Sequence, residues 1–359
     1  MQLSFQRSNL RSMRTLVSVL WVPFLISGLD AQSSDLSDPP LAANFSAQAV
    51  FVHHPQATET YIPQAPIVER MVDQGLGQLW GTPSTREGWR QRITPSDTIG
   101  LRIHSSTGKT SGSRPAVVAA IIQSLINAGH PAGQIIVWDR QLSSLRAAGY
   151  LSLRDRFGVR VLGARDLGYD GDASYESPLI GTLIWGDHEF GEKGEGKGRR
   201  SFVSSLITQQ ISKIVNIVPL LNHNRAGVNG CLFGLAMASV DNTLRFQVEP
   251  SRLAVAIPEI NALPDLGDRV ILNVVDALIA QYQGETQGRL QDSVVLNQLR
   301  FSTDPVALDC LSLEALTDLR RLKGIEPGPD YRELYENASL LELGVSDLSS
   351  IRVTHSSNP

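Results

Sequence analysis

Short apolar segments rich in β-branched residues alternate along this chain with segments whose apolar residues recur at helical spacing. The predicted strands are "AVFVHH" (49–54), "DTIGLRIH" (97–104), "QIIVWD" (134–139), "VRVLG" (159–163), "KIVNIVP" (213–219) and "RVILNVVDA" (269–277). The helical segments are 66–80, 114–129, 227–240 and 304–322, with a short helix before Tyr150. Strands that are apolar on both faces require cover on both sides, and alternation with helices favours parallel pairing. We expect an α/β fold: a mixed, mostly parallel sheet with helices on both faces, in Rossmann-like layers.

The N-terminal segment indicates where the protein works. Arg7, Arg11 and Arg14 precede the apolar run 16–28, and Leu29-Asp30-Ala31 offers small or apolar residues where a signal peptidase reads the chain. This order is typical of a secretory signal peptide. The run is shorter than the roughly twenty apolar residues that span a bilayer.

We therefore expect a signal peptide at 1–31, a flexible linker at 32–46 and a single α/β domain at 47–359. The mature protein would be exported, either periplasmic or extracellular, and would not be held at a membrane after cleavage. The competing interpretation is an uncleaved signal that anchors the protein in the membrane.

Charge and cysteine content narrow the function classes. A formal net charge of -4 and a pI near 6.0 provide no overall attraction to nucleic acid or anionic lipid. The chain has two cysteines, Cys231 and Cys310, and no Cys-x-x-Cys pair, so neither an iron–sulfur cluster nor a zinc finger is expected. In an oxidising compartment the two could pair, but both lie in apolar stretches typical of buried free thiols. The oligomeric state is left open.

The stretch "SSTGKTSGSRP" (105–115) contains a Gly-Lys-Thr that invites comparison with a phosphate-binding loop. A Walker A loop needs a glycine five residues before Gly108, where this chain has Ile103 inside a strand. The next helix also starts too late, because Ser113 is the plausible N-cap and Pro115 favours the first turn. The sequence therefore excludes a nucleotide-binding loop of this type.

A weaker anion site remains at the same place. The loop leads from a strand end to a helix N-terminus, where free N–H groups favour anions and where open α/β sheets collect ligands. We treat Arg102, His104, Lys109 and Arg114 as one wall of a predicted carboxylate or phosphate site. The alternative is a soluble loop with ordinary surface cations.

Several segments, in order, resemble a known family. They are "ERMVDQGLGQLWG", "SDTIGLRIH", "RPAVVAAIIQSLINAG", "IIVWD", "IVNIVPLLNHNRAGVNG", "VILNVVDALIAQYQGE", "RFSTDPVALDCLSLEAL" and "ASLLELGVSDLSSI". From about Val50 to its C-terminus the chain resembles the domain of unknown function family 362 (DUF 362), and "STDPVALD" after a strand is the most specific part. The resemblance implies an α/β fold and supplies no established reaction.

The chain departs from this family at several positions. Relatives often have lysine and asparagine at Arg102 and His104, lysine just before His223, and a Lys-Asn pair at Phe233-Gly234. Some relatives carry ferredoxin-like cysteines, which this chain lacks, so it resembles a divergent member without an iron–sulfur cluster. The missing lysines count against a shared catalytic function.

Single residues at predicted strand ends are the remaining candidates. His223 follows a buried-type strand and could act as a general base or metal ligand, or bond to backbone as a loop histidine. Asp139 ends one strand, where α/β sites place carboxylates, but could equally cap a helix. Asp304 is a helix cap before Pro305. Asp309 lies within that helix and needs a partner: an ion pair, a cationic loop or a metal.

Together these observations predict an exported protein that binds or transforms a small anionic molecule at the strand carboxyl ends. Arg102, Lys109, Arg114 and Arg225 are the ligand-binding candidates, and His223, His104, Asp139 and Asp309 are the catalytic candidates. His104 or His223 would accept or donate a proton, and Asp139 or Asp309 would orient these side chains. No spacing indicates a metal site. The alternative is a non-catalytic exported binding or accessory protein that has lost its relatives' chemistry.

Overall fold

The computed structural model describes residues 46–177, 198–284, 287–326 and 328–357. The predicted signal peptide, and the predicted linker apart from Ser46, lie outside these residues. The segment Asn44–Pro359 forms one compact unit. Within the described ranges, no helix combines the length and the apolar character needed to cross a membrane.

The described strands and helices alternate along most of the chain. The strands are β1 (Ala47–His53), β2 (Thr58–Glu59), β3 (Ile62–Pro63), β4 (Ile99–Ile103), β5 (Ile135–Asp139), β6 (Arg160–Gly163), β7 (Tyr169–Glu176), β8 (Arg200–Ser204), β9 (Lys213–His223), β10 (Gly227–Val228), β11 (Val270–Gln281), β12 (Ser293–Ser302) and β13 (Ile351–Ser357). The helices are α1 (Ala65–Trp80), α2 (Thr85–Arg90), α3 (Gly108–Ser111), α4 (Pro115–Asn127), α5 (Leu142–Ala147), α6 (Leu151–Phe157), α7 (Ser205–Gln210), α8 (Cys231–Ser239), α9 (Leu244–Gln247), α10 (Pro250–Asn261), α11 (Pro305–Leu322) and α12 (Arg332–Leu340).

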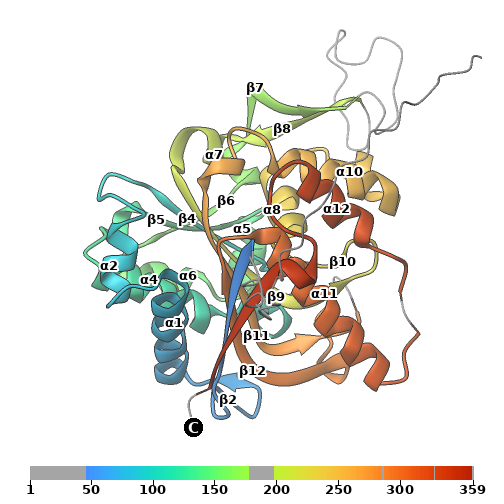
Figure 1. Cartoon of the computed structure of the whole chain (residues 1–359). Helices are drawn as coiled ribbons and strands as arrows, with labels where there is room; N and C mark the ends of the chain where they lie inside the picture. The colour runs from blue at the N-terminus through green and yellow to red at the C-terminus, as the bar shows by residue number, and fades with distance from the viewer. Residues whose placement is uncertain (1–45, 178–197, 285–286, 327, 358–359) are drawn as a thin grey trace, which may run out of the picture. The chain divides into compact units, whose positions relative to one another are not determined.

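One large mixed sheet organises the unit (Figure 1), and β2 with β3 and β7 with β8 form two separate two-stranded sheets. Five neighbouring strands run parallel in the order β11, β9, β4, β5 and β6. Strand β12 pairs antiparallel with β11, β1 pairs antiparallel with β12, and β13 lies parallel to β1 at the edge. The predicted fold class, a mixed and mostly parallel α/β sheet, is confirmed.

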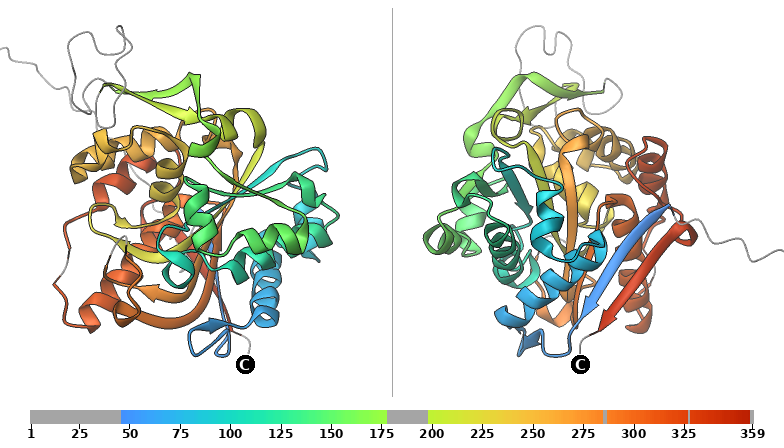
Figure 2. Two further views of the ribbon diagram at one scale, coloured as in Figure 1. Left: turned by 180° about the vertical axis from the view of Figure 1, so that it is seen from behind. Right: turned by 60° about the vertical axis from the view of Figure 1, so that its left-hand side comes forward.

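Helices cover both faces of this sheet, and each face has its own apolar core. On β4 the side chains alternate: Leu101 and Ile103 face one core, whereas Arg102 faces the other side. The first core packs under α1, α2, α4, α5 and α6. The second packs under α7, α8, α10, α11 and α12. Figure 2 shows the blue-to-green helices and the gold-to-red helices on opposite sides of the strands.

Strands β4 and β9 are parallel neighbours, but the chain continues from them toward opposite edges of the sheet, from β4 to β5 and from β9 to β11. After β4, helix α4 leads to β5 on one face of the sheet; after β9, helix α8 packs on the opposite face on the way to β11. The loops that follow these two adjacent strands therefore diverge. In open α/β sheets this switch point is where ligands bind, at the carboxyl ends of the strands.

The segment after β9 differs from the sequence-based prediction. A strand over 213–219 and a helix-like segment over 227–240 were expected, but β9 continues to His223 and β10 folds back on it, with Gly227 opposite His223. Helix α8 then begins at Cys231. It is buried on nearly every side, which removes the one-sided apolar pattern that would mark its start.

A glycine in α1 allows the helix to lie directly on the sheet. A Cβ added to Gly75 would lie 2.2 Å from Cε2 of the buried Phe301 on β12, whereas a Cβ on Gly77, two residues further along, would contact nothing within 4 Å. The contact with Phe301 therefore excludes even a methyl group at Gly75.

These two glycines form a matched pair for mutagenesis. We expect Gly75→Ala to lower the free energy of unfolding by about 1–3 kcal/mol, because the core is overpacked. Gly77→Ala should raise it by about 1 kcal/mol through helix propensity. Urea denaturation of both variants measures this, and equal effects at the two positions would contradict the packing of α1 on Phe301.

Candidate functional site

A small cavity lies at the carboxyl ends of β4 and β5, against α8. Its volume is about 190 Å³. The lining residues come from the two strands, the loops that follow them, and the helix: Arg102, His104, Ser106, Asp139, Arg140, Gln141, Ser144, Asn229, Phe233, Gly234, Met237 and Ala238. The cavity therefore lies beside the switch point between β4 and β9, and three of the predicted site residues line it. We call it the Arg102 pocket.

Arg102 is the distinctive group of this pocket. Its side chain is 2% exposed, and its Nε and Nη1 atoms have no hydrogen-bond partner among the described residues. Helix α8 passes close above it, because a Cβ on Gly234 would lie 2.1 Å from Nη1. Burial lowers the pKa of Arg102, and the negative charges of Asp139 and Asp309 partly offset this. A guanidinium remains charged under these conditions, so the pocket contains a buried cation that no direct ion pair neutralises among the described residues.

Asp139 supplies the opposite charge. Its Oδ2 accepts hydrogen bonds from the backbone N and the Oγ of Ser105, at 2.8 and 2.6 Å, and its Oδ1 accepts from the backbone N of Arg140 at 2.7 Å. These bonds hold the carboxylate rigidly at the end of β5. The sequence left open whether Asp139 lies in a site at the strand end or caps a helix. In the structure it lines the pocket at the end of β5 and holds Ser105 in the loop after β4.

His104 lies next to Arg102 at the end of β4. Its Nε2 is 3.1 Å from Oγ of Ser106 and 3.3 Å from Nδ2 of Asn229. Burial lowers the pKa of His104 to about 4; the charge of Arg102 adds to this effect and that of Asp139 opposes it. The imidazole is therefore neutral at neutral pH and can exchange hydrogen bonds with a ligand, but it is a weak base.

His223 lies behind the wall of the pocket. Its ring packs on Phe233, which lines the pocket, with ring centroids 4.1 Å apart. Its Nδ1 accepts hydrogen bonds from the backbone N of Ala226 at 3.0 Å and of Arg225 at 3.3 Å. Burial, with smaller effects of Arg225 and His104, lowers its pKa to about 3. These contacts match the loop histidine bonded to backbone and do not favour a general base.

The other predicted cations do not line the pocket. Arg114 is buried and forms an ion pair with Asp276, with Nη1 and Oδ1 2.8 Å apart, while its backbone N donates to Oδ2. It is also the N-cap of α4, the position predicted for Ser113. Lys109 is exposed on the short helix α3, and Arg225 is exposed and donates to the backbone O of Gln247. Of the four predicted ligand-binding cations, only Arg102 therefore lines this pocket.

Asp309 binds backbone, where an ion pair or a metal was anticipated. Its Oδ1 accepts from the N of Cys231 at 2.6 Å and its Oδ2 from the N of Leu232 at 2.9 Å, so α11 caps the start of α8. Burial raises its pKa to about 6. A Cβ on Gly230 would lie 2.1 Å from Oδ1, so only glycine fits there. Asp304, in contrast, caps α11 through the N of Ala307, as predicted.

Sequence reasoning missed the side of the pocket that belongs to α8. Asn229, Phe233, Gly234 and Met237 line it but carry no charge, and no motif marks them. Two signals pointed there: Phe233-Gly234 stands where relatives often have a Lys-Asn pair, and glycine inside a helical segment is unfavourable unless a neighbour approaches closely.

The described part of the chain contains neither a disulfide nor a cluster of side chains that could bind a metal ion. Cys231 and Cys310 are both buried free thiols. No group of three or more His, Cys, Asp or Glu side chains gathers there in a way that could hold a metal ion.

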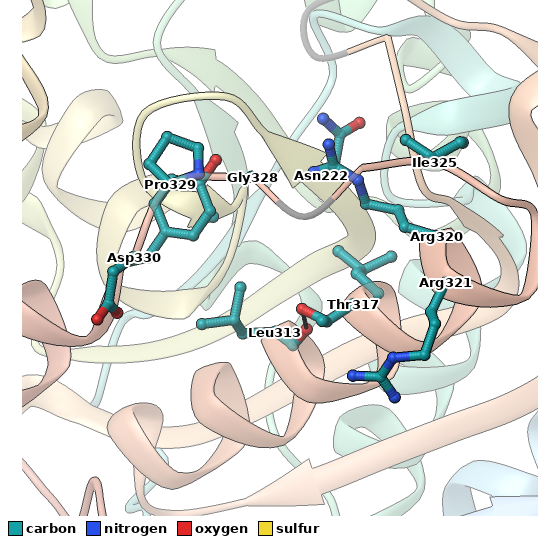
Figure 3. Close-up of a pocket in the computed structure, with 12 residues that line it drawn as sticks. Asn222, Leu313, Thr317, Arg320, Arg321, Ile325, Gly328, Pro329 and Asp330 are labelled. Carbon is teal, nitrogen blue, oxygen red and sulfur yellow. Dashed lines mark hydrogen bonds between the residues drawn. The ribbon is translucent and has the colours of Figure 1, made fainter.

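A second cavity lies between α11 and the segment that leads into α12 (Figure 3). Its volume is about 260 Å³, and Arg320 and Arg321 project from one side of it with Asp330 on the other. Arg321 pairs with Asp318 and Asp330 pairs with Arg332, on the surface. Arg320 donates to the backbone O of Glu326, and its Nε has no partner among the described residues. Two of the three charges are thus matched on the surface, and this cavity is a weaker candidate than the Arg102 pocket because it lies away from the carboxyl ends of β4 and β5.

Comparison with known proteins adds little. No protein family model matches the chain. No curated protein matches it either. A crystal structure of a Thermotoga maritima protein from the Northeast Structural Genomics Consortium is similar over 74% of this chain and 60% of that chain, with 10% sequence identity and a TM-score of 0.39. The chain thus spans less than two thirds of that protein's length, and a likeness of this degree supports no conclusion about function.

The ion pair of Arg114 and Asp276 can be tested directly. Asp276→Asn should lower the free energy of unfolding by about 3–5 kcal/mol, because it leaves the buried Arg114 without a full countercharge. Asp318→Asn, which breaks the exposed pair with Arg321, should cost less than about 1 kcal/mol. Denaturation with urea compares them, and similar costs would refute the structural role of Arg114.

The low pKa of His104 makes the protein sensitive to acid. Between pH 6.5 and about 4 the unfolded chain binds a proton at this imidazole and the folded protein does not, so stability falls as the pH falls through this window. We expect His104→Gln to lose about 2 kcal/mol less than the wild type between pH 7 and 5. Urea denaturation at both pH values measures this, and an unchanged pH dependence would show that His104 is not held neutral.

Proposed function

We propose that this protein binds a small anionic molecule in the Arg102 pocket. The observation that carries the proposal is the guanidinium of Arg102, which is 2% exposed, borders the cavity and has two nitrogen atoms without a partner among the described residues. An uncompensated buried charge is costly in a folded protein. A bound anion beside Arg102 would supply the missing countercharge.

The comparison of Arg102 with Arg114 supports this interpretation. Both side chains are 2% exposed, but Arg114 has Asp276 and two backbone oxygens as partners. The fold therefore provides acceptors for both terminal nitrogens of Arg114, whose Nε has none among the described residues, whereas Arg102 lacks a partner at Nη1 as well as at Nε. Arg102 is the one that lies at the carboxyl ends of the strands, beside the switch point of the sheet.

The size of the cavity limits the ligand. About 190 Å³ is below the roughly 300–1,000 Å³ of pockets for drug-sized molecules. The ligand would therefore have only a few non-hydrogen atoms. A nucleotide or a long peptide would not fit within this volume.

Binding is better supported than proton transfer. A general base works best with a pKa near the working pH, whereas burial holds the pKa of His104 at about 4 and that of His223 at about 3. His223 also spends its Nδ1 lone pair on backbone N–H groups. The second function we considered, chemical transformation of the anion, would require the bound ligand to raise the pKa of His104.

We also propose that the chain is an exported, divergent relative of the DUF 362 family. The ordered segments from about Val50 onward support the family, and the basic residues followed by an apolar run before Ala31 support export. On this proposal the pocket would work in the periplasm or outside the cell as a binding site without its relatives' lysines.

Replacement of Arg102 tests the binding proposal. We expect Arg102→Met to weaken binding at least tenfold for whichever of acetate, glycolate and inorganic phosphate binds the wild type, measured by titration calorimetry on the full chain. Lys109→Met removes an equal charge from the exposed helix α3 and should change affinity less than about twofold.

Gly234→Ala provides a second variant that keeps Arg102. The added Cβ would lie 2.1 Å from Nη1, so the guanidinium must move, while alanine favours the helix by about 1 kcal/mol. We expect weaker anion binding in a protein that remains folded by circular dichroism. The proposal fails if none of the three anions binds the wild type, or if both variants bind as the wild type does.

A further inference from the structure

Three charged residues line the Arg102 pocket, Arg102, Asp139 and Arg140, and the opposite charges of Arg102 and Asp139 do not pair with each other. Arg102 and Asp139 both line the cavity and act on each other electrostatically, but no ion pair or hydrogen bond joins them among the described residues. The donors to the carboxylate of Asp139 are instead Ser105 and the backbone N of Arg140. A cation with free donors and an anion therefore border the same small space.

Asp139 retains capacity to accept a further hydrogen bond. A carboxylate offers about four lone-pair sites. Three are used, by the backbone N and Oγ of Ser105 and the backbone N of Arg140. A ligand that fills the pocket thus meets donors on the Arg102 side and an acceptor on the Asp139 side. An anion without a donor of its own would interact with Arg102 but could not donate a hydrogen bond to Asp139.

The remaining walls restrict what joins these two ends. Phe233, Met237 and Ala238 of α8 form an apolar side, and the neutral His104 and Asn229 form a polar one. A cavity of about 190 Å³ favours a short carbon skeleton that carries both the anionic group and the donor. A hydroxyl or ammonium group on the carbon next to a carboxylate gives the shortest skeleton that carries both groups.

We propose that the Arg102 pocket takes a small carboxylate with a hydrogen-bond donor on the neighbouring carbon, its anionic end on Arg102 and its hydroxyl or ammonium group on Asp139. This ligand class comprises short 2-hydroxy acids and small amino acids. The inference rests on the proposed function and narrows it from any small anion to a bifunctional one.

Inorganic phosphate would meet Asp139 in this pocket as well as the cations Arg102 and Arg140. Near neutral pH it carries between one and two negative charges, and the carboxylate of Asp139 borders the same cavity. Like charges at short range in a low-dielectric site repel each other strongly. A monoanion that turns a donor toward Asp139 replaces this repulsion with a hydrogen bond.

The test is a ligand series on the full wild-type chain by titration calorimetry. The probes are acetate (anion alone), glycolate (anion with hydroxyl), glycine (anion with ammonium), methylammonium (cation alone) and inorganic phosphate. We expect glycolate or glycine to bind at least tenfold more tightly than acetate, phosphate and methylammonium. The tighter of the two identifies the donor.

Variants locate this preference in the structure. In Asp139→Asn the advantage of glycolate or glycine over acetate should shrink to less than about threefold, because the negative charge is lost and the one remaining acceptor oxygen is needed by Ser105 or Arg140. In Arg102→Met every carboxylate should bind at least tenfold more weakly. Asp318→Asn removes an equal charge from an exposed ion pair and should leave the series unchanged. If Asp139→Asn does not fold, the wild-type series decides by itself.

The outcomes separate this inference from the proposed function. If acetate or phosphate binds the wild type as tightly as glycolate and glycine do, and Arg102→Met abolishes that binding, the donor requirement is wrong and the anion site stands. If methylammonium binds most tightly, or if no probe binds, both proposals are overturned.

Discussion

The carboxylate of Asp309 is the contact on which the candidate site depends. It accepts the first two backbone N–H groups of α8, from Cys231 and Leu232, and so ties that helix to α11. From the sheet side, Nδ2 of Asn216 donates to the backbone O of Cys231 at 2.9 Å. These bonds fix the start of a helix that is buried on nearly every side, and they bring Gly234 against the guanidinium of Arg102.

The geometry of the pocket follows from this placement. Register pairing on adjacent parallel strands sets Arg102 beside Trp138 and Asn216, and neither supplies a countercharge. Asp139 follows Trp138 by one residue, at the end of β5, where Ser105 holds it. The sheet therefore brings one cation and one anion to the same cavity but does not pair them. This is the property that both functional proposals use.

Much of the architecture could be predicted, because it depends on local patterns. β-Branched runs such as Ile135–Asp139 identified the central strands, and Pro115 identified the start of α4. The residue pattern did not identify strand β12, which only the resemblance around "STDPVALD" implied, because only part of it is buried and its pattern is irregular around Asn297, which has a positive φ. The end of β9 and the start of α8 were also misplaced, since a strand and helix buried on all sides carry no periodic pattern.

The sequence by itself determined the α/β class, the order of the central strands and helices, and the presence of Arg102, His104 and Asp139 at strand ends. Only the tertiary structure decided which cations have partners. Arg114 and Asp276 are 162 positions apart, and they meet because α4 begins beside the middle of β11, where Asp276 lies. Arg102 belongs to the same residue type and is equally buried, but no acceptor reaches its Nε or Nη1 among the described residues. Charge compensation depends on distances in space, which composition and periodicity do not encode.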